Sequence, residues 1–429
     1  MTGRRFLLLH VTISSGHHHA SRAIAHALRR IDPFCQVINV DAFDYTSPFV
    51  RSAIHRSYFS VIRHQPNVWE YLYDNPAVHQ RVQRFRTLLH RYHTAKLARL
   101  LETVQPHAVA CTQAFPCGMI ADFKQQHGLR VPLVGVLTDF APHVYWLHDT
   151  VDAYIVAAEE LRDRFVANGV AAERIQVSGI PVEPKFLDPV DRPAVYREFD
   201  LDPQVPVVLI MGGGGGFGPI PELMASIDRM PDACQFVVIA GTNQPLLAWL
   251  RAQRFTHRVR VHGYIDAVPQ LMDIATLIIT KPGGLTTSEA LAKRLPLLIL
   301  SPIPGQEMCN ARYLLAQRAA EQLESPERAG EVVGELLRDR SRLDAVRRAS
   351  ERLSHPTSAM DAAQLMIELA DRYAERPNLL FGDDRGGTIH AAEAPRRAPR
   401  RQAWSPRKSP KRGSAEGEVS QRAGAATGS

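Results

Sequence analysis

Residues 281–314, KPGGLTTSEALAKRLPLLILSPIPGQEMCNARYL, contain two turns that each follow a buried strand and lead into a helix. A helix N-terminus gathers unpaired backbone N–H groups and a partial positive charge, so it suits an anion. Charged and hydroxyl-binding side chains accompany both turns: Lys281, Thr286 and Glu289 at the first, and Gln306, Glu307 and Asn310 at the second. A phosphate cradle beside hydroxyl-binding groups fits a sugar nucleotide and indicates glycosyl transfer.

A glycine-rich run, MGGGGGFGPI at residues 211–220, also follows a predicted strand and precedes a predicted helix. Glycines allow the backbone to approach a ligand closely. The run lacks the Gly-Lys-Ser/Thr ending of an NTPase loop. It is also a poor dinucleotide motif, because no acidic residue closes the next strand at Ala240. A merely flexible loop is the alternative, which the strand-to-helix context disfavours.

The corresponding turn of the first half is SSGHHHAS, residues 14–21. Successive helical side chains point about 100° apart, so the three histidines cannot converge on one metal ion. His17, directly after Gly16, is expected at the helix start facing a cleft, where a neutral imidazole can act as general base. A capping or solvent-exposed histidine is the alternative.

Asp139 follows another buried strand, so it is expected at the same edge of the sheet as His17. It can orient the histidine, accept the proton itself, or only cap a turn. The one Asp-x-Asp, at residues 200–202, precedes Pro203 and reads as a turn. We therefore expect no metal and no other cofactor, with loop amides and helix dipoles stabilising a diphosphate.

Bulk composition narrows the class of protein. The net charge of +7 is uneven, because residues 51–99 carry nine Lys and Arg against two Asp and Glu, and residues 376–429 carry 11 against five. This indicates an anion-facing surface rather than nucleic-acid binding. The five cysteines form no Cys-x-x-Cys pair, and no apolar run reaches the roughly 18 residues of a membrane span. We expect a cytoplasmic protein.

Short apolar runs alternate with helical patterns in two series, which predicts two doubly wound α/β domains with parallel sheets facing a cleft. The first series has six strands between residues 6 and 177, and the second has five between residues 207 and 300. We predict the following organisation: an N-terminal domain at 1–180 with a helical insertion at 47–104, a linker at 181–206, a second domain at 207–355, a helix crossing back to the first domain at 356–375, and a disordered basic tail at 376–429.

Taken together, these motifs resemble those of the monogalactosyldiacylglycerol synthase and processive diacylglycerol glucosyltransferase family, inverting enzymes of the GT-B fold. The similarity spans roughly residues 4–374. It is carried by these stretches: Gly16-His17, PNVWEYLY at 66–73, Thr138-Asp139, GIPV at 179–182, the glycine run, Gly241-x-Asn243, KPGGLTTSEAL and PIPGQEMCN.

The resemblance implies roles for individual residues. It places the UDP diphosphate against Gly212, Gly213, Gly214, Gly216 and Gly218, and the uracil beside Tyr264. It implies that Glu289 binds the ribose and that Gln306 and Glu307 bind the hexose. Asn310 would brace the turn that carries Gln306 and Glu307. Gly241, Asn243, Lys281, Gly283, Gly284 and Thr286 complete the donor site, His17 or Asp139 acts as base, and the acceptor lipid enters near Gly16, Trp69, Tyr73, Arg81 and Arg84.

The function that this resemblance implies is transfer of glucose or galactose from UDP-glucose or UDP-galactose to diacylglycerol at the cytoplasmic face of a membrane. The basic, aromatic-rich segment 51–99 suits an anionic membrane surface, and a solvated helical face is the alternative. Two alternative functions are compatible with the same fold: a UDP-N-acetylglucosamine transferase acting on a polyprenyl lipid, or a UDP-sugar epimerase. An inactive UDP-sugar sensor or lipid-binding scaffold is the non-enzyme alternative.

Overall fold

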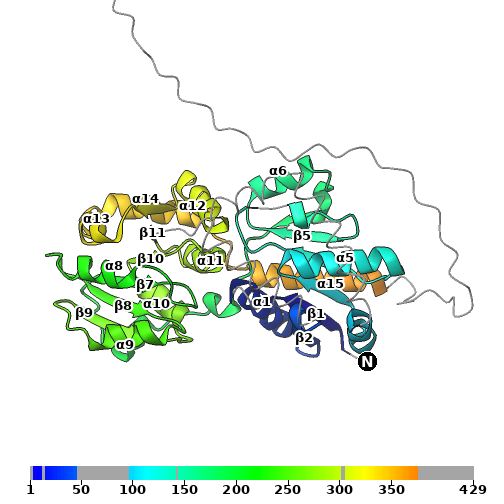
Figure 1. The fold of residues 1–429 in the computed structure, drawn as a ribbon, viewed down its shortest axis with the longest axis horizontal. Helices are drawn as coiled ribbons and strands as arrows, with labels where there is room; N and C mark the ends of the chain where they lie inside the picture. The colour runs from blue at the N-terminus through cyan, green and yellow to red at the C-terminus, as the bar shows by residue number, and fades with distance from the viewer. Residues whose placement is uncertain (1–2, 12–14, 46–95, 142–143, 301–304, 375–429) are drawn as a thin grey trace, which may run out of the picture.

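The structure, a computed structural model, describes residues 3–11, 15–45, 96–141, 144–300 and 305–374. It contains two six-stranded sheets, each wholly parallel, in the orders β2-β1-β3-β4-β5-β6 and β12-β11-β10-β7-β8-β9. Each sheet lies in its own α/β layer stack, and the two stacks stand side by side (Figure 1). The predicted pair of doubly wound domains is confirmed.

The N-terminal domain is built from the following elements: β1 Arg5–His10, α1 Ser15–Ile31, β2 Gln36–Asp41, η1 Ala42–Tyr45, β3 Ala108–Cys111, α5 Ala114–His127, β4 Leu133–Val136, η2 Val144–Trp146, β5 Ala153–Val156, α6 Glu159–Ala167, η3 Ala172–Arg174 and β6 Ile175–Val177. Its central strands are buried on both faces, as their uninterrupted apolar sequences require. Residues 96–104 are helical, whereas the rest of the predicted insertion and the predicted tail lie outside the described residues.

Residues 181–206, the predicted linker, contain two short helices, η4 Pro184–Leu187 and α7 Arg192–Glu198. The C-terminal domain follows with these elements: β7 Val207–Met211, α8 Ile220–Ile227, β8 Gln235–Ile239, α9 Gln244–Ala252, β9 Arg258–His262, α10 Val268–Ile274, β10 Leu277–Thr280, α11 Gly284–Ala292, β11 Leu297–Leu300, α12 Gln306–Ala316, β12 Ala320–Leu323, η5 Pro326–Arg328, α13 Ala329–Arg338 and α14 Arg340–Arg352.

Strand β12 was absent from the predicted second series, which ended at residue 300. Its sequence, AEQL, has a charged and a polar residue at its centre, and only Ala320 and Leu323 are buried. The strand sits at the sheet edge beside β11, where one face is open to polar groups. Because this strand is short and half polar, its sequence does not indicate a strand.

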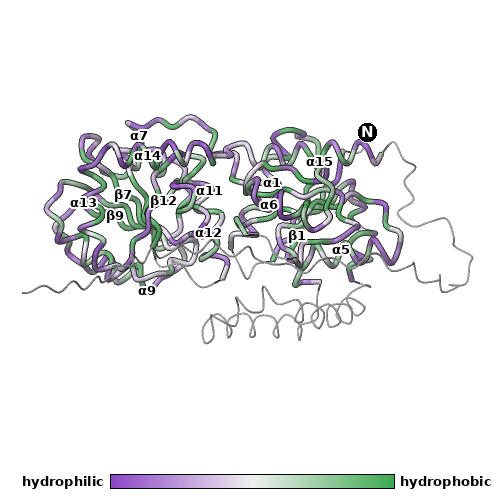
Figure 2. Tube along the Cα trace, turned by 90° about the horizontal axis from the view of Figure 1, so that it is seen from above, coloured by the Kyte–Doolittle hydropathy of each residue, from purple (hydrophilic) through white to green (hydrophobic). Residues whose placement is uncertain are grey.

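The last helix, α15 Ser358–Ala374, returns to the N-terminal domain and packs against α1 and β3. Figure 1 shows it among the N-terminal helices rather than beside α14. Its buried face includes Ala362 and Met366, both fully inaccessible, which join the apolar cluster around Phe6 and Leu28. Figure 2 shows hydrophobic stretches in the central strands of both domains and hydrophilic ones on the periphery.

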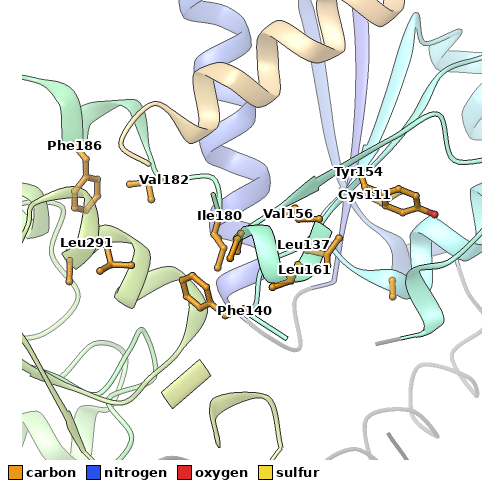
Figure 3. Close-up of a cluster of buried hydrophobic side chains, with 14 of the residues drawn as sticks. Cys111, Leu137, Phe140, Tyr154, Val156, Leu161, Ile180, Val182, Phe186 and Leu291 are labelled. Atoms are coloured by element: carbon orange, nitrogen blue, oxygen red, sulfur yellow. The ribbon is translucent and has the colours of Figure 1, made fainter. Parts of the chain in front are cut away.

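Apolar packing continues from one domain to the other. One buried cluster runs from Leu137 and Val156 of the N-terminal sheet, through Phe140 and Ile180, to Leu291 of α11 (Figure 3). The two domains therefore share a common core at the place where the strand ends of both sheets approach each other.

Candidate active site

A cavity of about 480 Å³ opens between the two domains. Most of the predicted site residues line it: Gly16, His17, Asp139, Gly213, Gly214, Gly241, Tyr264, Lys281, Gly283, Gly284, Thr286, Glu289, Gln306 and Glu307. They follow the carboxyl ends of strands in both parallel sheets, where ligands of doubly wound folds bind. The cavity therefore joins the predicted donor side and the predicted base side in one space.

His17 occupies the first turn of α1 and is held at two points. Its backbone carbonyl accepts a hydrogen bond from the Thr112 hydroxyl at 2.9 Å, and its Nδ1 shares one with the Thr138 hydroxyl at 2.8 Å. In the tautomer in which Nδ1–H donates to the Thr138 hydroxyl, Nε2 is the ring nitrogen that can receive a proton. Burial lowers the pKa of His17 to about 4, so the ring is neutral at physiological pH.

Asp139 lies two residues beyond Leu137, on the same cleft wall as His17. The pKa of its carboxyl is raised to about 7: burial is the largest cause and the negative charge of Glu307 adds to it, whereas a hydrogen bond from Asn310 and the charge of Lys281 oppose the rise. The Asn310 amide reaches Asp139 Oδ1 from the other domain at 3.1 Å. Asp139 is thus a carboxyl group poised to gain or lose a proton near neutral pH.

The glycine-rich loop after β7 folds back on itself and presents Gly213, Gly214 and Gly215 to the cavity. Gly212 and Gly216 do not line the cavity but shape the loop, and their predicted contact with the diphosphate stays a prediction. A Cβ on Gly212 would stand 2.3 Å from the Phe217 carbonyl oxygen, and one on Gly216 would stand 2.1 Å from the Ala240 carbonyl oxygen. Gly218, with φ 122°, is likewise absent from the cavity wall.

Asn243 does not line the cavity but braces the glycine-rich loop, and its predicted role in donor binding stays a prediction. Its side-chain oxygen caps α9 by accepting from the Leu246 N–H at 3.0 Å, and its amide donates to the Gly216 carbonyl at 3.1 Å. A helix cap that also binds the loop fixes the loop against the next strand-to-helix turn.

Lys281 follows β10 and forms an ion pair with Glu307 of α12. Its Cε lies 2.9 Å from the position that a Cβ on Gly213 would take, so the side chain crosses from the glycine-rich loop to the second helix start. A cation there is placed to meet a phosphate, and Glu307 and Gln306 lie on the adjoining first turn of α12.

Glu289 lies in α11 and lines the cavity. Its pKa is raised to about 8: burial is the largest cause, the charge of Lys185 opposes the rise, and the charge of Glu183 adds to it. A carboxyl group in such surroundings is suited to hydrogen bonding with ligand hydroxyls that replace the lost water. This agrees with its predicted contact with ribose, which remains a prediction.

Several cavity residues were not predicted. His19 and Arg22 come from α1, and Glu183 and Lys185 come from the linker. Arg22 Nη2 lies 3.9 Å from Glu183, and His26 Nδ1 lies 2.7 Å from it. Residues 19, 22 and 26 share one helix face by their spacing, which is a pattern that sequence reasoning could have used.

Tyr264, predicted to border the uracil, is 52 % exposed, and its ring stacks on that of His19 with centroids 6.4 Å apart. The two rings come from different domains. Trp69, Tyr73, Arg81 and Arg84, the predicted acceptor and membrane residues, lie outside the described residues. Within the described ranges, no helix is long and apolar enough to cross a membrane and no group of three metal-ligating side chains occurs.

Comparison with known proteins places this architecture in a class. MurG from Acinetobacter baumannii superposes with a TM-score of 0.55 at 16% identity, covering 85% of this chain and 99% of that one. The UDP-GlcNAc 2-epimerase from Neisseria meningitidis, bound to UDP-GlcNAc, gives 0.54 at 13% identity, covering 86% and 100%. With its two facing α/β domains and cleft, the chain has the GT-B fold of glycosyltransferases.

Sequence comparison narrows the class to a family. Residues 17–182 match the model of monogalactosyldiacylglycerol (MGDG) synthase, and residues 207–365 match that of the glycosyltransferase family 28 C-terminal domain. The processive diacylglycerol beta-glucosyltransferase of Bacillus cytotoxicus is 33% identical over 277 residues, which cover 64% of this chain and 70% of the relative. The corresponding enzyme of Bacillus thuringiensis is 32% identical over 276 residues, with the same coverage. The chain belongs to this diacylglycerol glycosyltransferase family, which confirms the resemblance described above.

Proposed function

We propose that this protein transfers glucose or galactose from a UDP-sugar to the free hydroxyl of diacylglycerol, with inversion at the anomeric carbon. The observation that carries the proposal is the single cavity in which Glu289, Gln306 and Glu307 of one domain face His17 and Asp139 of the other. Family membership supports diacylglycerol as the acceptor, since the relatives are named for that activity.

The donor side would hold the UDP-sugar through the C-terminal domain. Amides of Gly213–Gly215, the N-terminus of α11 and the Lys281 ammonium would take the diphosphate, and Glu289 would take the ribose. Gln306 and Glu307 would contact hexose hydroxyls at the start of α12. These groups can stabilise the departing UDP by charge and oriented dipoles, so we propose that the reaction needs no metal or other cofactor.

The acceptor side would remove the hydroxyl proton as the anomeric carbon gains positive charge. A general base is most effective when its pKa lies near the operating pH, and Asp139, with a pKa of about 7, meets this condition better than His17, with a pKa of about 4. We therefore propose that Asp139 is the general base that accepts the proton of the acceptor hydroxyl. Neutral His17 would accept a hydrogen bond through Nε2 and orient the lipid hydroxyl.

The reaction would take place at a membrane surface, because diacylglycerol does not leave the bilayer freely. Segment 51–99, with its nine Lys and Arg, is proposed to face anionic headgroups. Each such cation near the surface contributes about 1 kcal/mol to membrane binding.

The test is an assay of the purified protein with labelled UDP-glucose or UDP-galactose, vesicles containing diacylglycerol and an anionic phospholipid, and EDTA. We expect a labelled hexosyl-diacylglycerol, and a loss of about 10²-fold or more in Asp139→Asn. No glycolipid from either hexose donor, together with retained UDP binding, would overturn the proposal and identify a sugar-nucleotide sensor. Product only with UDP-N-acetylglucosamine and a polyprenyl acceptor would overturn it as well.

A further inference from the structure

Asn310 is a fully buried polar side chain in the second turn of α12. Its amide nitrogen donates to Asp139 Oδ1 and to the Pro282 carbonyl, each at 3.1 Å, and its oxygen accepts from the Phe140 N–H at 2.9 Å. Both amide hydrogens and the amide oxygen are used, and the opposite amide orientation would set N–H against N–H. The side chain is therefore locked in one orientation by partners in both domains.

The same face of α12 docks on the N-terminal domain at two further points. The Tyr313 ring stacks on Phe140, with centroids 4.8 Å apart and planes 12° apart, and Gln317 donates to Glu160 Oε1 at 2.8 Å. Asn310, Tyr313 and Gln317 are spaced three and four residues apart, so they line one stripe of the helix. This stripe lies beside the apolar cluster that joins the domains through Phe140, Ile180 and Leu291 (Figure 3).

One helix thus carries two different groups of the site. Gln306 and Glu307, proposed to contact the hexose, precede Asn310 by four and three residues, a rise of about 4.5–6 Å along the axis. A helix is rigid over one turn, so the position of the hexose contacts fixes the position of the Asn310 amide. The carboxylate that Asn310 holds belongs to the opposite domain.

The loop that carries Asp139 is fastened to the C-terminal domain at another point. A Cβ on Gly284, at the start of α11, would lie 2.1 Å from the Thr138 carbonyl oxygen, so the two backbones are in close contact. The Thr138 hydroxyl in turn holds His17 Nδ1. Both candidate bases are therefore oriented through residues 138–140, which lie against the donor-binding domain.

We propose that Asn310 is a positioning residue for glycosyl transfer: it fastens the Asp139 carboxyl group of one domain to the proposed hexose-binding helix α12 of the other, so that the base is held in a fixed place relative to the hexose contacts. This inference rests on the proposed function. An apolar side chain at this position would remove the hydrogen-bond partner of the Phe140 N–H, the Pro282 carbonyl and Asp139 Oδ1.

The charged groups facing Asp139 are Glu307 and Lys281 of the C-terminal domain, and His17 is the titratable neighbour on its own cleft wall. Replacement of Asn310 by aspartate keeps the side-chain shape and the bond from the Phe140 N–H. It sets a second carboxyl group against Asp139, and like charges in contact raise the pKa of one member of the pair.

The experiment is the pH profile of turnover for wild type and Asn310→Asp. We expect the acidic limb to move upward by about one pH unit or more. The variant should then lose about eightfold or more of wild-type turnover at pH 6.5 and recover most of it at pH 9. The dissociation constant for UDP, measured by calorimetry, should stay within about twofold, because the proposed UDP contacts are elsewhere.

Gln317→Ala is the matched control, since it removes a contact from the same stripe without touching Asp139, and its profile should coincide with that of wild type. If Asn310→Asp does not fold, Asn310→Ala is used, which removes the bond that lowers the pKa of Asp139 and should shift the limb in the same direction. An unshifted limb with reduced turnover, or a parallel loss of UDP affinity, would reduce Asn310 to a packing residue and overturn the inference.

A titration of the Asp139 carboxyl by carbon-13 NMR separates this inference from the proposed function, because it needs no turnover. A higher pKa for Asp139 in Asn310→Asp shows that residue 310 acts on the Asp139 carboxyl, whether or not wild type forms glycolipid, and failure to form glycolipid then counts against the proposed function alone. An unchanged pKa overturns it even if glycolipid is formed.

Discussion

At the scale of single residues, the site is defined by three ionisable groups whose pKa values burial has moved away from their ordinary range. The pKa of His17 falls to about 4, that of Asp139 rises to about 7, and that of Glu289 rises to about 8. Burial disfavours the charged form of each, which accounts for both directions. His17 and Asp139 lie on the same cleft wall. The lowered pKa makes His17 a weak base near neutral pH, and the raised pKa makes Asp139 a more effective one.

The pH dependence of kcat/KM distinguishes these two groups. If Asp139 takes the proton, activity should fall on the acidic side with a midpoint near pH 7, where its carboxylate becomes protonated. His17→Gln should lower the rate and leave that midpoint in place. A midpoint near pH 4 in wild type, removed by His17→Gln, would instead assign the proton to His17.

Replacement of Glu289 by glutamine tests its raised pKa through stability. Between its ordinary value of 4.5 and its folded value of about 8, Glu289 is protonated in the folded state and ionised in the unfolded state. Stability of the wild type therefore falls as pH rises through this window. Glutamine does not titrate, so the Tm advantage of Glu289→Gln should grow from pH 5 to pH 8.5 in thermal unfolding. A Tm difference that is independent of pH would show that Glu289 is ionised in the folded protein.

The residues of the donor side could be predicted from the sequence because they lie at or just after strand-to-helix turns. Lys281, Glu289, Gln306 and Glu307 all line the cavity as their spacing suggested. For Asn243, the sequence could not distinguish a helix cap from a ligand-binding side chain, because both occur at the same position of a strand-to-helix turn.

At the scale of elements, α11 and the loop after β4 form a close backbone contact between the two domains. Gly284 begins α11, and the space that its Cβ would need is taken by the Thr138 carbonyl and the Ile180 side chain. Gly283, one residue earlier, has no atom within 4 Å of its Cβ position. Two adjacent glycines thus have different structural roles.

Gly284→Ala should force α11 and Thr138 apart. We expect a loss of stability of about 1–3 kcal/mol, typical of overpacking, together with reduced turnover, because His17 is held through Thr138. Urea unfolding and the glycolipid assay measure both effects. Gly283→Ala serves as the control for stability and should unfold at the wild-type urea concentration, and equal stability of the two variants would contradict the described contact.

Docking of α12 on the N-terminal domain could not be predicted from sequence. The pairing of Asn310 with Asp139 joins positions 171 residues apart, and no periodic pattern within either segment relates one domain to the other. Strand and helix periods fix only the faces of single elements. The arrangement of domains depends on the shared core around Phe140, which tertiary packing alone defines.

At the scale of the whole molecule, the chain crosses between domains twice, through the linker and through the last helix. The helix α15 buries Ala362 and Met366 against the N-terminal core, and Asp371 pairs with Arg4 at 2.9 Å. The final helix of the described chain thus stabilises the first strand. Alternating strand and helix patterns were enough to predict two domains, whereas the edge strand β12 was too short and polar to recognise.

Met366→Ala should destabilise the N-terminal domain. Its side chain is fully inaccessible, and removing it leaves a cavity between α15 and α1, which costs about 2–5 kcal/mol. Gln364→Ala, on the exposed face of the same helix, should change stability by less than about 0.5 kcal/mol. Denaturant unfolding measures both, and equal stability of the two variants would show that α15 does not hold the domain.

The most direct test of the central claim is the glycolipid profile of a bacterial host that expresses this chain, analysed by mass spectrometry and NMR. Hexosyl transfer with inversion predicts a new hexosyl-diacylglycerol with a β-anomeric linkage, absent from the host that expresses Asp139→Asn at equal level. An unchanged lipid profile despite folded protein, or a product carrying an α-linked sugar or an N-acetylhexosamine, would contradict it.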